Sequence, residues 1–484
     1  MPLGFDTAVS SLDWVLNLSI TVLEQILFFD IAGLPLVILW LLFGATYFTL
    51  RMGFINIRAF RHAIDITLGR YDDPDEPGEV SHFQAIATAL SATVGLGNIA
   101  GVAIAIQLGG PGTVVWMTLV GFLGMSSKFV EYTLAPLYRT FRPDGTVAGG
   151  PMYYLSQGFD KLGLKPLGQG LAASFAVFCA LGALGGGNMF QASQAQAAIA
   201  YFFPAINAYT WVYGLILSLL VGLVIIGGIQ RIGAVAAAIV PTMAGLYILA
   251  GLWIILLHWA DIPAAVTLIT QAAWHPQAVE GGMLGVMVQG IRRGLFSNGA
   301  GVGSAAIAHA ATRTKEPVRE GIVASLEPFI DTVVICNVTA LVCVLTNAYQ
   351  SAPKSALGFE LVAMAFEDGM TGFPLLLTMA VCLFAFSTII SWAYYGEQCW
   401  RYLTRDRLPL VYRVGYVGAT FVGSVTQPGI VLAFSDMMMF AVVLPNLFGC
   451  IVLSNQVAQA LQDYWQRLIS GRMSVHSINL LGNP

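Results

Sequence analysis

The sequence predicts an all-α polytopic membrane protein, and three observations carry this prediction. Of the 484 residues, 57% are hydrophobic and only 10% are charged, whereas a soluble domain carries roughly 25% charged residues. The mean hydropathy is +0.75. The hydrophobic residues form uninterrupted runs whose length is close to the ~20 residues that a helix needs to cross a bilayer. A β-barrel would instead show segments that alternate between hydrophobic and polar residues.

Eleven runs are candidate transmembrane helices, and they are called spans 1 to 11 below. In order, they cover residues 33–51, 82–107, 112–136, 168–203, 210–228, 235–258, 282–309, 320–348, 373–395, 409–427 and 430–453. The earlier apolar stretch 14–29 is short and contains Glu24. We therefore interpret it as an interfacial helix that lies on the membrane surface.

The positions of lysine and arginine predict the orientation of the spans. Of the 22 basic residues, 18 fall on one side of an eleven-span arrangement, counting Arg51 and Arg413 near span ends, and Lys354 alone falls on the other; Lys128, Arg292 and Arg293 lie within spans. We expect the N-terminus outside and the C-terminus in the cytoplasm, in the plasma (inner) membrane. The N-terminus lacks the basic region of a cleavable signal peptide. The six cysteines form no CxxC pair, which argues against a zinc site.

Two spans contain sequences that are poor for a helix. Span 2 contains VGLGNIAG (Val94 to Gly101), and span 7 contains LFSNGAGVGSAA (Leu295 to Ala306). Each glycine costs about 1 kcal/mol relative to alanine within a helix, so both segments are expected to unwind. One stretch alone could instead mark close helix packing, because GNIAG is a GxxxG motif.

The two interruptions lie five spans apart, so spans 2–6 and 7–11 have opposite topology. Interrupted helices at matching positions of two inverted halves point to a transporter's binding site near the membrane midplane. The predicted organisation is an interfacial segment (1–32), an extra first span with its loop (33–81), a first repeat (82–258), an extracellular connection (259–281), a second repeat (282–453) and a cytoplasmic tail (454–484).

Long segments resemble a known family. The VGLGN of span 2 resembles the unwound first helix of transporters with the leucine-transporter (LeuT) fold. Most of the chain is similar to the alanine or glycine:cation symporter (AGCS) family of sodium:alanine symporters. The similar segments are SATVGLGNIAGVAIAIQLGGPG, FVEYTLAPLYR, GGPMYYL, GLFSNGAGVGSAAIAHAATRTKEPVREG and AFSTIISWAYYGEQ.

This resemblance implies where substrate and ion bind. The carboxylate of a small amino acid suits the amide groups of unwound glycines, and its ammonium suits carbonyls that the breaks release. The expected substrate contacts are Thr93, Gly95, Leu96, Gly97, Asn98, Gln191, Phe296, Ser297, Asn298, Gly299, Gly301 and Trp392. Sodium prefers carbonyl and hydroxyl oxygens, as hard cations do. Its expected ligands are Ser91, Val94, Ser387 and Thr388. Alternatives remain for four of these residues. Gln191 could instead form hydrogen bonds between helices, and Trp392 could be a core residue. The hydroxyls of Ser387 and Thr388 could donate to carbonyls of their own helix.

Ionisable residues within spans are candidates for function. Glu327 and Asp331 share a face of span 8, and Arg292 lies early in span 7 beside Arg293. One interpretation is a buried ion pair that gates the bundle; another is a proton or second-cation site at Asp331, with Asn337 nearby. Glu131 and Lys128 are expected to form a structural or gate pair near the inner end of span 3.

These features favour a sodium-coupled symporter of alanine, and also glycine, that works by alternating access. GLGNIA matches a dinucleotide-binding fingerprint, but it lacks the required βαβ context, and no HExxH motif is present. The chain is therefore not expected to be an enzyme, and it needs no cofactor beyond the coupling ion, Na⁺. The alternatives are a proton-coupled or broader neutral amino-acid transporter (for glutamine, for example), a channel, or an amino-acid sensor.

Overall fold

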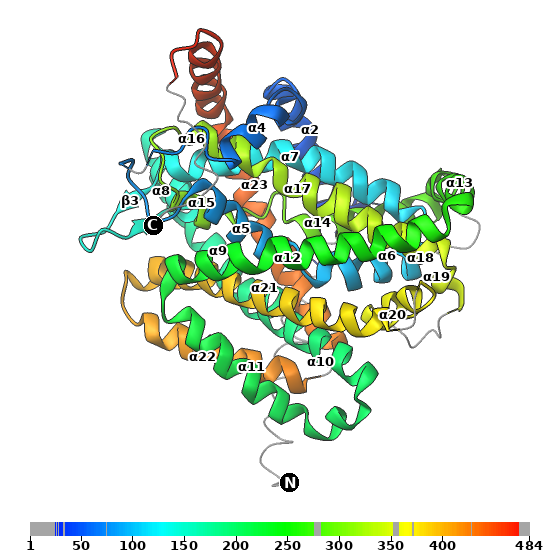
Figure 1. Cartoon of the computed structure of the whole chain (residues 1–484). Helices are drawn as coiled ribbons and strands as arrows, with labels where there is room; N and C mark the ends of the chain where they lie inside the picture. The colour runs from blue at the N-terminus through cyan, green and yellow to red at the C-terminus, as the bar shows by residue number, and fades with distance from the viewer. Residues whose placement is uncertain are drawn as a thin grey trace.

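A computed structural model describes the chain at residues 25, 27, 29–31, 34–73, 75–274, 282–351, 358–369, 372–426 and 428–473. These residues are mostly helical, and the long helices lie together in one bundle (Figure 1). The predicted all-α class is confirmed for this part of the chain. The expected interfacial helix at 14–29 falls mostly outside the described residues.

The first half of the described chain holds four short strands and the helices up to residue 257. In order, these elements are β1 (Asp30–Ile31), β2 (Leu34–Pro35), α2 (Leu36–Arg51), α3 (Ile55–Arg58), α4 (Phe60–Thr67), α5 (His82–Thr93), η1 (Gly97–Gly101), α6 (Val102–Gly109), α7 (Thr113–Leu137), β3 (Thr140–Phe141), β4 (Val147–Ala148), α8 (Pro151–Lys161), α9 (Lys165–Leu184), η2 (Gly185–Met189), α10 (Phe190–Phe202), η3 (Pro204–Tyr209), α11 (Thr210–Ile225) and α12 (Gly228–Leu257). β1 pairs with β2 and β3 with β4, both antiparallel.

The second half is helical where it is described. Its elements are η4 (Trp259–Asp261), α13 (Ile262–Trp274), α14 (Gly282–Asn298), α15 (Ala306–Ala310), α16 (Pro317–Ala324), α17 (Leu326–Pro328), η5 (Phe329–Cys336), α18 (Asn337–Leu345), α19 (Ala348–Ser351), α20 (Phe359–Glu367), α21 (Phe373–Thr404), α22 (Pro409–Val425) and α23 (Pro428–Ile469). The predicted boundary at 453/454 lies inside α23, so the start of the expected tail is helical. The expected connection 259–281 contains α13.

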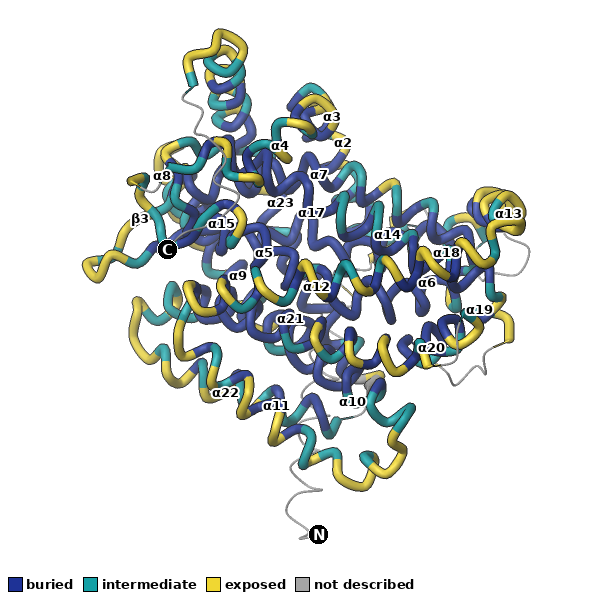
Figure 2. Tube along the Cα trace, in the orientation of Figure 1, coloured by how far each residue is buried: buried dark blue, intermediate teal, exposed yellow. Residues whose placement is uncertain are grey.

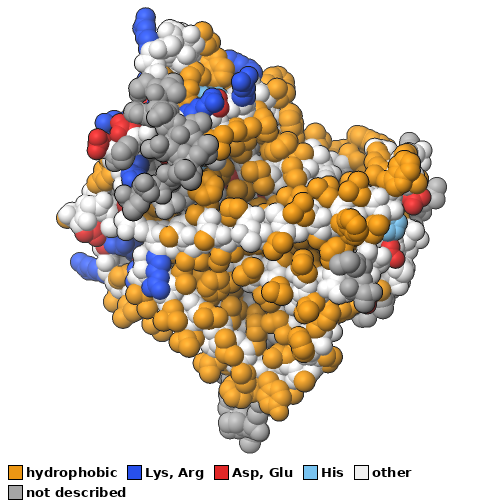
Figure 3. Space-filling model, in the orientation of Figure 1, with side chains coloured by type: hydrophobic (Ala, Val, Ile, Leu, Met, Phe, Trp, Pro, Cys, Tyr) orange, Lys and Arg blue, Asp and Glu red, His pale blue; other side chains and the backbone are white. Residues whose placement is uncertain are grey.

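Multiple membrane crossings are confirmed. Within the described residues, seven helices are long and apolar enough to span a membrane, and the bent pair α5 to α6 makes up to eight. Predicted spans 1, 7 and 10 coincide with α2, α14/α15 and α22, which are shorter or interrupted. Eleven crossings therefore remain a prediction. The outer helices expose hydrophobic side chains such as leucine and isoleucine, and the residues of the central helices are buried (Figures 2 and 3).

The broken helices lie in the interior of the bundle. α14 packs against α7 and η1, and α5 packs against α12 and α21. The first turn of α5 is fixed by a capping box, in which the Ser81 hydroxyl accepts from the Gln84 N–H and the Gln84 side chain accepts from the Ser81 N–H. This local signal sets where span 2 begins.

Basic side chains join several helix ends at one end of the bundle, which we call the basic end. Arg139 at the end of α7 donates to the carbonyl of Thr312 (2.5 Å), and Arg467 of α23 pairs with Glu316 (2.6 Å). Arg51 at the end of α2 donates to Asn455 of α23 (2.5 Å). Loops predicted to share one side of the membrane are therefore neighbours.

Candidate substrate and ion site

Span 2 is a broken helix, as predicted. α5 ends at Thr93, and Val94 has extended backbone (φ −73°, ψ 92°). The chain then resumes through the π-helical turn η1 into α6, with a bend of 48°. The break lies at Val94 to Gly97, among buried residues.

The glycines of this break permit close approach by other spans. A Cβ at Gly95 would lie 2.7 Å from Thr388 Oγ1 and 3.3 Å from Gln191 Oε1. A Cβ at Gly97 would lie 3.3 Å from the Cα of Ser297. Spans 4, 7 and 9 therefore all reach the break, and Gly95 in particular has no space for a side chain.

Span 7 is also broken. α14 ends at Asn298 and α15 begins at Ala306, and the glycines at 299, 301 and 303 have φ values of +60°, +87° and +75°. Such left-handed backbone strongly favours glycine. The helix continues to Asn298, four residues into the stretch expected to unwind, so Phe296 and Ser297 lie in its last turn. The last carbonyls of a helix lack intrahelical partners, so this turn can still offer them.

Asn98 connects the two breaks. Its Oδ1 accepts from the N–H of Gly95 (2.8 Å), and its Nδ2 donates to Ser297 Oγ (2.9 Å) and to the carbonyl of Asp331 (3.1 Å). The side chain predicted to contact substrate thus fixes the shape of the unwound segment. Its contacts tie span 2 to spans 7 and 8.

Asp331 is the centre of a buried polar cluster. Its Oδ1 accepts from Ser297 Oγ (2.6 Å) and Thr332 Oγ1 (2.7 Å), and Thr332 in turn accepts from Asn298 Nδ2 (3.2 Å). Asp331 Oδ2 is buried and has no hydrogen-bond partner among the described residues. Asn337, expected nearby, instead donates to Thr118 (2.9 Å).

Span 9 places oxygens against the last turn of α5. Thr388 Oγ1 donates to the carbonyl of Ser91 (2.8 Å), and Ser91 Oγ donates to the carbonyl of Ser387 (2.6 Å). Ser391 Oγ donates to Ser91 Oγ (3.0 Å). These contacts gather three hydroxyls and two carbonyls. The Ser387 hydroxyl donates to the carbonyl of Phe384 (3.0 Å) in its own helix, which is the alternative stated for it above. Ser391 was missed, although its spacing of three from Thr388 puts both on one face.

Gln191 and Trp392 also lie at the break. Gln191 Oε1 accepts from the N–H of Leu96 (3.4 Å), and its Nε2 donates to a carbonyl of η2 (3.0 Å). Trp392 Nε1 donates to the carbonyl of Ala92 (2.9 Å). A Cβ at Gly187 would lie 2.2 Å from Trp392 Cγ, so the glycine of η2 makes room for the indole.

The predicted gate pairs are wrong. Arg292 and Arg293 pair with Asp436 of α23 (2.8 and 2.5 Å), in place of Glu327 or Asp331. Glu327 instead pairs with Lys128 (3.0 Å). Glu131, the expected partner of Lys128, accepts from Asn446 (3.2 Å). The π-helix η5 begins just after Glu327 and contains Asp331, and the two acids contact different groups.

Comparison with known proteins identifies relatives along nearly the whole chain. A profile of the sodium:alanine symporter family matches residues 16–477. The sodium/alanine symporter AgcS of Methanococcus maripaludis is 39% identical over 425 residues, which is 87% of this chain and 92% of AgcS. The probable sodium/glutamine symporter GlnT of Bacillus subtilis is 34% identical, with 93% and 91% of the two chains aligned.

A solved structure supports the fold. MhsT in complex with L-phenylalanine superimposes with a TM-score of 0.56 at 16% identity, covering 80% of this chain and 93% of MhsT. The broken helices and this likeness indicate the LeuT fold. The chain belongs to the sodium:alanine symporter family. It is accordingly a sodium-coupled amino-acid symporter and not an enzyme.

Proposed function

We propose that the chain imports alanine, and also glycine, with sodium by alternating access, and that both bind where the two broken helices meet spans 4 and 9. The observation that carries the proposal is the approach of Thr388 Oγ1 to the carbonyl of Ser91, directly before the break. The substrate carboxylate would bind the amides of Gly95 to Gly97. The ammonium would bind carbonyls of Thr93 and of the last turn of α14.

The crowding at the break favours a small substrate. Trp392 fills the space beside Gly187, and Thr388 and Gln191 fill the space beside Gly95. A methyl side chain or a hydrogen fits such a site better than the side chain of glutamine. Because the name of GlnT indicates that a relative carries glutamine, substrate competition has to decide the range.

The sodium site would use oxygens already gathered at Ser91. The Ser91 carbonyl and the Thr388 and Ser391 hydroxyls are hard donors of the kind sodium prefers, and the Val94 carbonyl completes the proposed set. Each hydroxyl can turn its hydrogen away when the ion arrives. Asp331, with its unpartnered Oδ2, is the proposed site for a second cation or a proton.

The proposed topology has eleven spans, with spans 2–6 and 7–11 as inverted repeats and the basic end in the cytoplasm. The N-terminus would be outside and the C-terminus inside, because the positive-inside rule places clustered arginines in the cytoplasm. Sodium and substrate would leave at the basic end.

The proposal is tested by uptake of labelled alanine into proteoliposomes. We expect uptake to require an inward sodium gradient and to be inhibited by unlabelled alanine and glycine more than by glutamine. Uptake that follows a pH gradient in sodium-free buffer would overturn sodium coupling and favour Asp331 as a proton site. Stronger inhibition by glutamine would overturn the small-substrate assignment.

Thr388→Ala should raise the sodium concentration for half-maximal uptake more than it raises the apparent KM for alanine at saturating sodium. The reason is that Thr388 Oγ1 lies against the Ser91 carbonyl. Ser387→Ala is the matched control, because that hydroxyl bonds within its own helix. The measurement is a sodium titration of initial uptake rates. Equal loss of sodium and alanine affinity in Thr388→Ala would show that Thr388 contacts substrate instead.

A further inference from the structure

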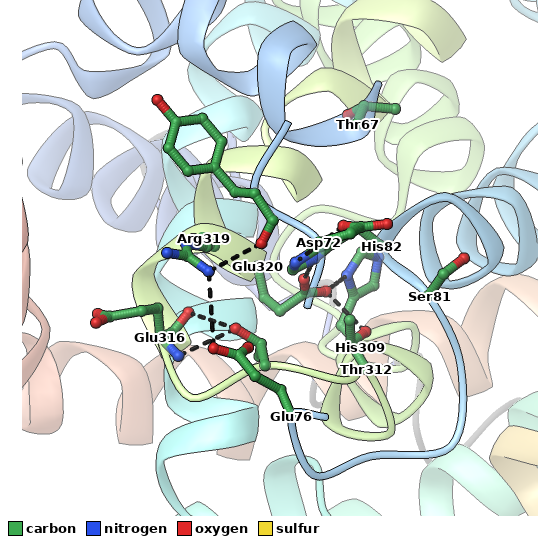
Figure 4. Close-up of polar contacts among 12 residues, drawn as sticks. Thr67, Asp72, Glu76, Ser81, His82, His309, Thr312, Glu316, Arg319 and Glu320 are labelled. Carbon is green, nitrogen blue, oxygen red and sulfur yellow. Dashed lines mark hydrogen bonds and ion pairs between the residues drawn. The ribbon is translucent and has the colours of Figure 1, made fainter. Parts of the chain in front are cut away.

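A buried row of acids and bases lies between the basic end and the break of span 7, outside the proposed substrate and sodium sites. It consists of His82 in α5, Glu320 in α16, His309 in α15, Glu327 in α17 and Lys128 in α7. Each is at most 1% exposed. Figure 4 shows the part of the row where His82 and His309 contact the two carboxylate oxygens of Glu320.

His309 is held between two carboxylates. Its Nδ1 lies 2.6 Å from Glu320 Oε2, and its Nε2 lies 2.9 Å from Glu327 Oε1. The other oxygen of Glu327 is 3.0 Å from Lys128 Nζ and accepts from Tyr132 (3.2 Å). Lys128 therefore balances the charge of Glu327.

The two contacts of His309 require an extra proton. Each ring nitrogen faces a carboxylate oxygen, so each contact needs one hydrogen. A neutral imidazole between two ionised glutamates carries only one. The arrangement therefore holds one proton more, either on the imidazole ring or on a carboxyl group. This proton balances the charge of Glu320, and its loss would set a nitrogen lone pair against a carboxylate.

The row reaches solvent through Glu320, His82 and Asp72. His82 Nδ1 contacts Glu320, and His82 Nε2 lies 3.6 Å from Asp72 Oδ1. Neither His82 Nε2 nor Asp72 Oδ1 has a hydrogen-bond partner among the described residues, whereas the Asp72 side chain is 38% exposed. Burial is the largest influence on Asp72 and raises the pKa of its carboxyl, while neighbouring His82 opposes the rise.

Other elements present charges to the same groups. Glu320 also accepts from the Thr312 hydroxyl (2.9 Å). The further charged or titratable groups around the Asp72 and Glu320 end are Arg139, Arg313, Arg319 and Glu76, and those around Glu327 are Glu131, Tyr132 and Tyr395. Arg139 and Arg319 donate to backbone carbonyls, so the hydrogen between Glu320 and His309 comes from neither of them.

The same groups lie next to a set of contacts that joins span 7 to the segment before span 2 at the basic end. Directly after α15, residues 311–314 pair with residues 77–80: the N–H of Glu79 donates to Ala311 (2.7 Å) and the N–H of Arg313 donates to Val80 (2.8 Å). Arg139 donates to the carbonyl of Thr312 (2.5 Å) and to other carbonyls of both segments. Span 7 cannot move away from span 2 at this end unless these contacts separate.

We propose that Glu320 and His309 form a proton-binding site open to the cytoplasm, and that its proton holds residues 311–314 against residues 77–80. On opening, the proton leaves through His82 and Asp72 to cytoplasmic water, and one proton returns on closing. Because the closed form binds the proton, low pH favours closure and rising pH favours opening. The inference uses the proposed orientation, but it does not depend on which amino acid is carried.

A cysteine at position 80 reports on this opening in the purified full-length protein. Val80 is only 1% exposed, so Val80→Cys should react slowly with a polar maleimide while the end is closed. The labelling rate of Asp144→Cys, at an exposed position, gives the pH dependence of the maleimide reaction itself. The labelling of the unsubstituted protein gives the contribution of the native cysteines. Between pH 6 and pH 9 we expect the corrected labelling rate at position 80 to rise about tenfold, as expected when a charge-assisted hydrogen bond is lost.

Glu320→Gln, made in the Val80→Cys protein, removes the need for the extra proton. An amide nitrogen at the place of Oε2 donates to neutral His309 and to Thr312, while the amide oxygen accepts from His82. Labelling should then stay slow across the pH range. His62→Gln is the matched control and should keep the wild-type pH profile, because His62 contacts Tyr464 (2.7 Å) and lies outside the row.

Sodium-driven uptake by Glu320→Gln at pH 6 checks that the variant is folded. A labelling profile of Glu320→Gln that parallels that of the parent would overturn the proton site. A flat profile in the parent would overturn it as well. If the labelling rate follows the expected pH profile but uptake depends on neither sodium nor alanine, the proposed function would be contradicted and the proton site would not.

Discussion

Gly95→Ala should lower the initial rate of sodium-driven alanine uptake at least tenfold while leaving the amount of folded protein in the membrane unchanged. The new methyl group would lie 2.7 Å from Thr388 Oγ1 and 3.3 Å from Gln191 Oε1. Overpacking of this kind costs about 1–3 kcal/mol. Here it would push apart the Ser91 carbonyl and the Thr388 hydroxyl, which we propose as sodium ligands. The measurement is uptake at saturating sodium, normalised to folded protein.

Gly101→Ala is the matched control, because it adds the same methyl group in the same broken segment. Among the described residues, the nearest atom to its Cβ outside its own helix would be the carbonyl oxygen of Leu96, at 3.9 Å. We expect near-normal uptake. Equal loss in Gly95→Ala and Gly101→Ala would mean that the segment needs backbone flexibility rather than the contact with Thr388.

Lys128→Met should destabilise the protein by about 3–5 kcal/mol, the cost of removing one partner of a buried ion pair. Lys128 and Glu327 are 1% and 0% exposed and lie 3.0 Å apart. Without the ammonium, the partners of the Glu327 carboxylate among the described residues are Tyr132 and His309. The measurement is the free energy of unfolding of the detergent-solubilised protein in denaturant.

Two further variants separate the stability lost with the ion pair from the stability lost by replacing any lysine with methionine. Lys165→Met removes an exposed lysine that lies 3.7 Å from Asp160, and it should change stability by less than about 0.5 kcal/mol. The double variant Lys128→Met/Glu327→Gln should recover part of the loss. A Lys128→Met protein as stable as Lys165→Met would contradict the assignment of this pair.

The sequence was sufficient to predict both broken helices, because glycine clusters leave a local signal. The breaks at Val94 and after Asn298 lie inside the two predicted stretches, and Thr388 meets Ser91 as expected. The exact end of α14 was not predictable. Asn298 Oδ1 accepts from the N–H of Ala300 just beyond the helix end, and the periodicity of the sequence does not reveal such a contact.

Partners that come from distant spans were not predictable in the same way. Lys128 lies three residues before Glu131, so local spacing favoured that pair, but packing of α7 on α16 and α17 brings Glu327 closer. Arg292 and Arg293 meet Asp436 of α23, which lies 143 residues after Arg293, so no local spacing points to this pair. The rotation of α21 likewise decided that Ser391, rather than the Ser387 hydroxyl, faces Ser91.

The central claim is that sodium and alanine share one site at the crossing of the two broken helices. Equilibrium binding of alanine to the purified protein, measured over a series of sodium concentrations, tests this claim most directly. We predict that saturating sodium lowers the Kd for alanine, and that saturating alanine lowers the Kd for sodium by the same factor, as linkage requires. An alanine Kd that does not change with sodium would contradict the shared site.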